Sequence, residues 1–152
     1  MLLPLSIGDV SNLWDSRIAP ASWAFSIWSL IYSLIVAFTI YQAIPDRCTP
    51  RRNNDLIFNK VSYWFSINLF CSALWSPFWC LNTIAGFIIA LVVIIGMLFT
   101  AVMVLDKSLK SRLSVMSLIT LRCGFSIYAG WLSVATILNV GFVMKSLGFS
   151  EA

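Results

Sequence analysis

The feature that most constrains this chain is the uncharged stretch between Arg122 and Lys145. The 22 residues between these two charges include no Asp, Glu, Lys or Arg. At 1.5 Å per residue, a helix of that length crosses a hydrocarbon layer about 30 Å thick. The stretch therefore predicts a helix that spans a membrane.

One face of this predicted helix differs from the others. Tyr128, Trp131, Ala135 and Asn139 follow one another at helical spacing, so they share a face. That face carries two aromatic rings with polar tips, a small residue and an amide. It either packs against another helix, as small and polar residues commonly do in membranes, or lines a cavity for a ligand. The larger apolar residues are expected on other faces, against lipid or neighbouring helices: Ile127, Val134, Leu138 and Phe142.

Composition extends the prediction to the whole chain. The 152 residues are 60% hydrophobic and 11% charged, whereas an ordinary soluble domain is about 25% charged. We therefore expect an all-α, polytopic membrane protein of one domain, a bundle of four transmembrane helices. The predicted spans are about residues 21–43, 61–81, 84–105 and 122–144. They lie in a transmembrane domain at 20–145, between an N-terminal interfacial segment at 1–19 and a tail at 146–152.

The segments between the spans differ in kind. The pair Asn82–Thr83 allows only a tight turn, so the second and third spans must run antiparallel. Gly86 and Gly96 are expected to let a neighbour approach closely. Residues 106–121 begin with a charged turn, and their apolar remainder either lies in the membrane interface or extends the last helix.

The basic residues predict an orientation. The loops at 44–60 and 106–122 carry eight Lys and Arg residues, whereas the other side holds only Arg17 and Lys145. Basic loops remain on the inner side of a membrane. We therefore expect both loops on the cytoplasmic or matrix side and both chain ends on the outer side. The first residues resemble neither a secretory signal nor a mitochondrial transit peptide.

The sequence offers little to a catalyst or a metal ion. It has no histidine, and all six acidic residues fall in loops or tails. Ion relays use intramembrane carboxylates, lysines or histidines, and metal sites use clustered ligands. Cys71, Cys80 and Cys123, in or beside the spans, are expected to be buried thiols rather than disulfides. We therefore expect no enzyme, no metal site and no coupled transporter. Because membrane topology explains the basic loops, we also expect no nucleic-acid partner.

Aromatic surface is present in excess. Of seven tryptophans, Trp28, Trp75, Trp79 and Trp131 fall at helical positions in or near the spans. An indole has a large flat apolar face and one N–H, which suits flat apolar ligands such as tetrapyrroles or sterols. It suits subunit interfaces equally well, so both alternatives remain open.

Three segments resemble one known family. PASWAFSIWSLIY at Pro20–Tyr32 resembles the proline and tryptophan signature of the TspO/MBR family, which includes the tryptophan-rich sensory proteins and the mitochondrial translocator protein. YAGWLSVATILN at Tyr128–Asn139 resembles the family's last-helix pattern, and WSPFW at Trp75–Trp79 is similar to its middle segment. The resemblance covers about residues 20–145.

This resemblance implies a helical bundle with a pocket for porphyrins, sterols or similar apolar ligands. The residues of the ligand-binding hypothesis are Trp23, Phe25, Trp28, Tyr32, Trp75, Trp79, Tyr128, Trp131, Ala135 and Asn139.

The chain departs from the family pattern in three places. The family has five transmembrane helices, whereas only 19 residues precede Pro20 here. We expect the place of the first helix to be empty or filled by another chain. Ile127 replaces a proline before the last-helix motif, and Cys71 and Ser72 stand where an asparagine is usual.

Two functions from different classes follow. The first is a non-catalytic accessory subunit of a larger complex, such as a respiratory complex of the mitochondrial inner membrane, with the bilayer and neighbouring membrane subunits as partners. The second is a receptor or carrier for a porphyrin, sterol or similar apolar ligand. Under either hypothesis a bound lipid, sterol or tetrapyrrole is the only cofactor we expect.

Overall fold

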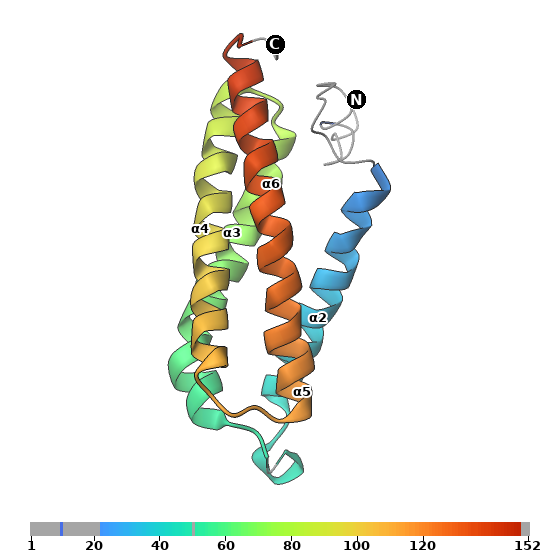
Figure 1. Ribbon diagram of the computed structural model, residues 1–152, viewed down its shortest axis with the longest axis vertical. Coiled ribbons are helices and arrows are strands. Elements are labelled where there is room, and N and C mark those ends of the chain that lie inside the picture. The colour runs from blue at the N-terminus through green and yellow to red at the C-terminus, as the bar shows by residue number, and fades with distance from the viewer. Residues whose placement is uncertain (1–9, 11–21, 50, 150–152) are drawn as a thin grey trace.

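The computed structural model describes residues 10, 22–49 and 51–149 of the chain, which form a bundle of helices (Figure 1). Its long helices are α2 (Ile27–Ala43), α3 (Ser62–Cys80), α4 (Ile84–Leu109) and α6 (Gly124–Ser146). The described residues include no strand. The predicted all-α bundle with four long helices is thereby confirmed. Of the interfacial segment expected at 1–19 only Val10 is described, and the expected tail is described as far as residue 149.

Short helical turns extend the long helices at their ends. They are the 3₁₀ turns η1 (Ser22–Ser26) and η2 (Asp46–Cys48), the π-helical turns η3 (Asp55–Val61) and η4 (Leu118–Cys123), and α5 (Val115–Ser117). Because α5, η4 and α6 follow one another without a break, Val115–Ser146 is one helix of 32 residues. The apolar segment before residue 122 therefore extends the last helix. The third long helix also exceeds its expected end near residue 105, since α4 continues to Leu109.

Three helices in the described part of the chain are long and apolar enough to cross a membrane. They are Trp23–Ala43, Ile84–Leu109 and Val115–Ser146. The remaining predicted span, α3, has 19 residues and a length of about 28 Å, but it is the more polar helix. Its polar residues Asn68 and Ser72 are buried, so they face the bundle rather than lipid.

The third long helix, α4, is the centre of the packing. It contacts both α3 and α6 extensively, whereas α2 contacts α6 and η4 over a smaller area. Figure 1 shows α2 diverging from α6 towards its N-terminal end. The bundle is therefore tighter among α3, α4 and α6 than between α2 and the rest.

A polar contact joins α3 to α4 inside the bundle. The Nδ2 atom of Asn68 donates to the carbonyl of Met97 at 2.9 Å and to Oγ1 of Thr100 at 2.8 Å. Thr100 in turn donates to the carbonyl of Gly96 at 2.9 Å. Interhelical hydrogen bonds of this kind in membranes are worth about 0.6–2 kcal/mol. The contact fixes the register of the two helices at mid-length.

Two arginines cap helix C-termini at the loop end of the bundle. Arg52, whose side chain is only 3% exposed, donates from Nη1 to the carbonyls of Tyr41, Gln42 and Ile44 at 2.9, 3.0 and 2.6 Å. Arg122 likewise donates to the carbonyl oxygens of Ser108 and Ser111, at the end of α4. The last carbonyls of a helix have no intrahelical partner and carry partial negative charge. The arginines supply the missing hydrogen-bond donors and also a positive charge next to these carbonyls.

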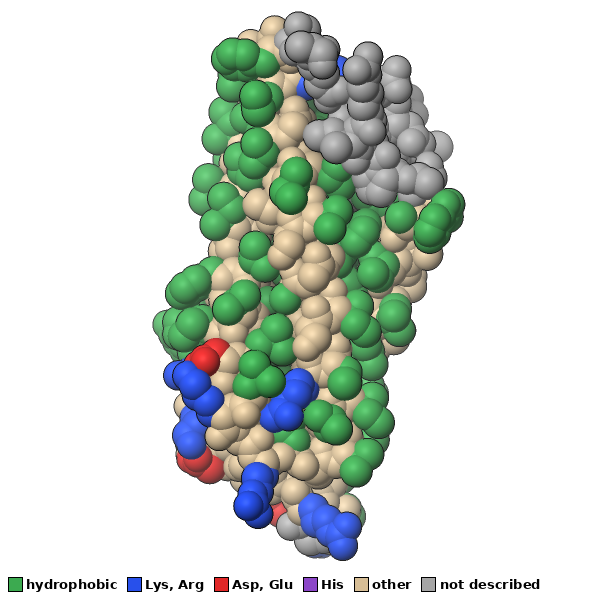
Figure 2. All heavy atoms as spheres, in the orientation of Figure 1, with side chains coloured by type: hydrophobic (Ala, Val, Ile, Leu, Met, Phe, Trp, Pro, Cys, Tyr) green, Lys and Arg blue, Asp and Glu red, His purple; other side chains and the backbone are tan. Residues whose placement is uncertain are grey.

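Most of the basic side chains gather at this same end, below an apolar surface that covers the helices (Figure 2). Both basic loops therefore lie together, as the sequence predicts. Cys71, Cys80 and Cys123 are free thiols, as the sequence predicts, but the predicted burial is wrong: Cys123 is exposed, and Cys71 and Cys80 are half-buried. Much of the surface of a membrane span faces lipid, so a position within an apolar span does not ensure burial in protein.

The turn between α3 and α4 depends on two backbone features. Asn82 has a φ of +49°, a left-handed conformation that asparagine tolerates better than most residues. Thr83 caps α4 by accepting a hydrogen bond from the Gly86 N–H at 3.1 Å. A Cβ atom on Gly86 would meet the carbonyl oxygen of Phe78 at 2.7 Å. The close approach expected at Gly86 is confirmed, whereas a Cβ atom on Gly96 would meet only the Sγ atom of Cys71, at an ordinary contact distance of 3.8 Å.

Gly86→Ala should lower the free energy of unfolding by about 1–3 kcal/mol, since the methyl group must push a backbone carbonyl aside. The control is Gly130→Ala on α6, where a Cβ would meet nothing within 4 Å. That change should raise stability by about 0.5–1 kcal/mol through helix propensity. Circular dichroism during denaturation in mixed micelles measures the free energy of unfolding of each variant. An equal change in the two variants would contradict the close approach at Gly86.

Candidate functional site

An aromatic cavity lies between η1, α2, α3 and α6. We call it the aromatic cavity and define it by its lining residues, which are Phe25, Trp28, Trp75, Trp79, Trp131, Ala135, Leu138, Asn139 and Phe142. Its free space is about 20 Å³, enough for about one water molecule. The rings themselves occupy most of the room between these helices.

The rings form a continuous stack across two helices. Trp28 stacks on Tyr32 of its own helix at 5.5 Å and on Trp75 of α3 at 5.6 Å. Trp75 stacks on Trp79, also at 5.6 Å, and Trp79 meets Phe142 of α6 edge-on at 4.8 Å. Each pair along a helix is spaced i, i+4, which places both rings on one face. Ring pairs of this kind contribute about 0.5–1.5 kcal/mol each beyond their buried area.

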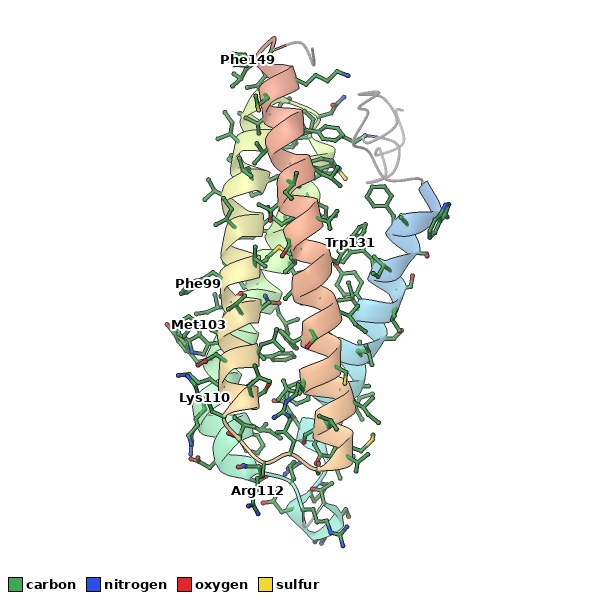
Figure 3. The ribbon with its side chains drawn as sticks, in the orientation of Figure 1. Phe99, Met103, Lys110, Arg112, Trp131 and Phe149 are labelled. Atoms are coloured by element: carbon green, nitrogen blue, oxygen red, sulfur yellow. The ribbon has the colours of Figure 1, made fainter. Side chains whose placement is uncertain are left out.

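Trp131 joins the last helix to this stack. Its side chain projects from α6 towards α2 (Figure 3). It meets Trp28 at 6.2 Å and Phe25 at 6.0 Å, both nearly perpendicular. These edge contacts join α6 to η1 and to the N-terminal half of α2, beside the stacked contact of Trp28 with Trp75 of α3.

Several polar atoms in the cavity wall have no hydrogen-bond partner among the described residues. They are the indole Nε1 atoms of Trp28, Trp75 and Trp131 and the Oδ1 atom of Asn139. The Nδ2 atom of Asn139 is used, since it donates to the carbonyl of Ala135 at 2.8 Å. A buried polar group without a partner costs about 1–3 kcal/mol. Residues of the cavity wall therefore carry three donors and one acceptor that the protein itself leaves unused.

Seven of the ten residues singled out from the sequence line this cavity. They are Phe25, Trp28, Trp75, Trp79, Trp131, Ala135 and Asn139. The other three lie elsewhere. Trp23 is 79% exposed. Tyr32 stacks on the far side of Trp28 and hydrogen-bonds to Ser72 at 3.4 Å. Tyr128 is fully buried and meets Trp28 edge-on at 6.2 Å, without lining the cavity.

Two lining residues were expected on other faces of the last helix. Leu138 and Phe142 are buried, at 8% and 3% exposure, and line the cavity. Their spacing of i+3 and i+7 from Ala135 was the available signal, because such residues share a helical face.

The lining of the cavity is aromatic and apolar apart from one amide, that of Asn139. No ionisable side chain lines the cavity. Across the described part of the chain, no three His, Cys, Asp or Glu residues lie close enough to hold a metal ion. What the wall provides is flat apolar surface with a few fixed hydrogen-bonding atoms, which is typical of sites for small apolar molecules.

A comparison with known families agrees with this arrangement. The family model described as "TSPO-like protein" matches residues 2–152. The match includes all four long helices and every residue of the aromatic cavity. No curated protein and no solved structure matches the chain.

Proposed function

The chain belongs to the TSPO-like family, and on that premise we propose that it is a membrane receptor or carrier for a flat apolar ligand. The ligand enters the aromatic cavity between α2, α3 and α6. The supporting observation is the set of unpartnered donors and the one acceptor in the cavity wall. In hydrocarbon no water replaces a missing partner. A ligand that forms hydrogen bonds with these atoms therefore removes the free-energy cost of leaving them unpaired.

The chemistry of the wall favours a neutral ligand. An ionised group buried without a counter-ion is costly, and the cavity has no charged residue. A hydroxyl group can accept from an indole N–H and donate to Asn139 Oδ1, so a sterol meets both requirements. A tetrapyrrole suits the stacked rings, provided that its carboxylates remain outside the cavity.

Binding requires the rings to move apart. The free space of about 20 Å³ is far below the roughly 300–1,000 Å³ of ligand pockets. The movable element is α2, because it packs on α6 less extensively than α4 does. A shift of α2 away from α6 separates Trp28 from Trp75 and Trp131, and a flat ligand then takes the place of the indole of Trp28 in the stack.

Purified protein titrated with dehydroergosterol or protoporphyrin IX should show saturable quenching of tryptophan fluorescence. Ala135→Leu should weaken binding of the better probe more than tenfold, since it fills the cavity. Trp131→Phe should weaken it about three- to tenfold, because it keeps a ring and removes one neutral hydrogen-bond donor. The matched control is Trp64→Phe, since Trp64 contacts Phe99 at 5.8 Å and lies outside the cavity.

Two outcomes of that titration contradict the receptor function. One is the absence of saturable binding by either probe. The other is that Ala135→Leu lowers the thermal stability of the protein but leaves its affinity for the probe unchanged. That result is expected if Ala135 lies in a closed contact between helices, which the larger side chain overpacks.

The second candidate is a non-catalytic accessory subunit of a larger membrane complex, such as a respiratory complex of the mitochondrial inner membrane. It is favoured by one observation, the tight filling of the interior by stacked rings. Under this proposal the native protein, extracted in mild detergent, migrates on a native gel with a large complex at fixed stoichiometry. Migration as a monomer or dimer overturns it.

For either function we propose that the basic end of the bundle faces the cytoplasm or matrix. Cys48 is exposed on this end and serves as a native label site. A membrane-impermeant maleimide should react with it only after permeabilisation of intact cells or organelles. The control variant Cys48→Ser should lose that reaction, and labelling of Cys48 before permeabilisation would reverse the orientation.

A further inference from the structure

A second hollow lies at the basic end of the bundle and shares no lining residue with the aromatic cavity. It is a groove of about 630 Å³, lined by Tyr41, by residues 49 and 51–52 of the first basic loop, and by residues 113–116 before α6. We call it the basic groove. Its size is that of a site for a small molecule or a lipid headgroup.

Hydrogen bonds hold the two walls of the groove together. The hydroxyl groups of Tyr41 and Ser114 lie 2.9 Å apart. Asn53 Nδ2 donates to the carbonyl of Arg112 at 3.3 Å. Arg52 fixes the floor, because its guanidinium is buried and bonded to the carbonyls that end α2. The groove is thus a formed feature rather than a gap between loose loops.

Arg51 gives the groove an uncompensated positive charge. It is exposed and lines the groove, and the described residues place no ion-pair partner on it. The nearby acidic groups are engaged elsewhere: Asp46 pairs with Arg52, and Asp55 pairs with Lys60 at 2.7 Å. The hydrogen bond from Lys60 also lowers the pKa of Asp55. A guanidinium without a carboxylate partner is suited to a phosphate.

Apolar side chains stand directly beside this charge. Val115 and Met116 line the groove and are 72% and 51% exposed. Leu118 and Ile119, on the next turn of the same helix, are exposed as well. They belong to the 32-residue apolar helix that is long enough to cross a membrane. The groove therefore lies where the polar end of the bundle meets its membrane-facing surface.

We propose that the basic groove binds an anionic phospholipid, with the phosphate at Arg51 and the acyl chains along Val115 and Met116. The free positive charge and the apolar rim together match a molecule with an anionic head and apolar tails. Each basic residue near a membrane surface adds about 1 kcal/mol of attraction to anionic lipid. The site is independent of the aromatic cavity.

The test is native mass spectrometry of the full chain in detergent, titrated with dioleoyl phosphatidylglycerol or dioleoyl phosphatidylcholine. The wild type should bind phosphatidylglycerol about fivefold more tightly than phosphatidylcholine. Arg51→Gln should abolish nearly all of the preference for phosphatidylglycerol, whereas Arg51→Lys should retain most of it. The matched control is Arg47→Gln, another exposed arginine of the same loop, which does not line the groove.

Three results would overturn the proposal. The first is equal affinity of the wild type for both lipids. The second is an equal loss in Arg51→Gln and Arg47→Gln, since diffuse loop charge then accounts for the preference. The third is competition by inorganic phosphate as strong as that by phosphatidylglycerol, which assigns the groove to free phosphate. Unchanged circular dichroism of the Arg51 variants verifies that they fold.

Discussion

The whole structure depends on the cost of leaving a polar group without a partner in hydrocarbon. Helices satisfy their own backbone groups, which is why a chain with so few charges forms a helical bundle. The same requirement explains the pairing of Asn68 with Thr100 and with the carbonyl of Met97 in the interior. It also explains the buried guanidinium of Arg52, which donates hydrogen bonds to the last carbonyls of α2.

The aromatic cavity holds four of the eight buried side-chain atoms that lack a hydrogen-bond partner in the described part of the chain. Three indole N–H groups and the Asn139 Oδ1 atom lie in its wall without partners among the described residues. In the proposed receptor function, a hydrogen-bonding ligand would pair with these atoms, and the rings would separate to admit it. The weaker packing of α2 on α6 is the feature of the fold that supports such a movement.

The basic end of the bundle combines two uses of arginine. Arg52 and Arg122 are committed to helix carbonyls and act as structural caps. Arg51, the sequence neighbour of Arg52, remains exposed beside hydroxyl groups and an apolar rim. Sequence alone does not distinguish the two neighbours, because both are arginines of one polar loop. The fold separates them by turning one side chain inward to α2 and leaving the other at the membrane-facing groove.

Hydropathy and charge in the sequence by themselves determined the helical class, the four long helices, the tight turn at Asn82–Thr83 and the placement of both basic loops at one end. These properties are local, since they depend on runs of apolar residues and on the residues that interrupt them. The motifs likewise located seven residues of the aromatic cavity. Only the tertiary structure decided that Leu138 and Phe142 complete its wall, that Tyr128 and Trp23 do not, and that Cys123 is exposed. Which face of a helix meets protein and which meets lipid depends on how helices tilt and pair. That information is shared among all the helices and is not contained in any one stretch.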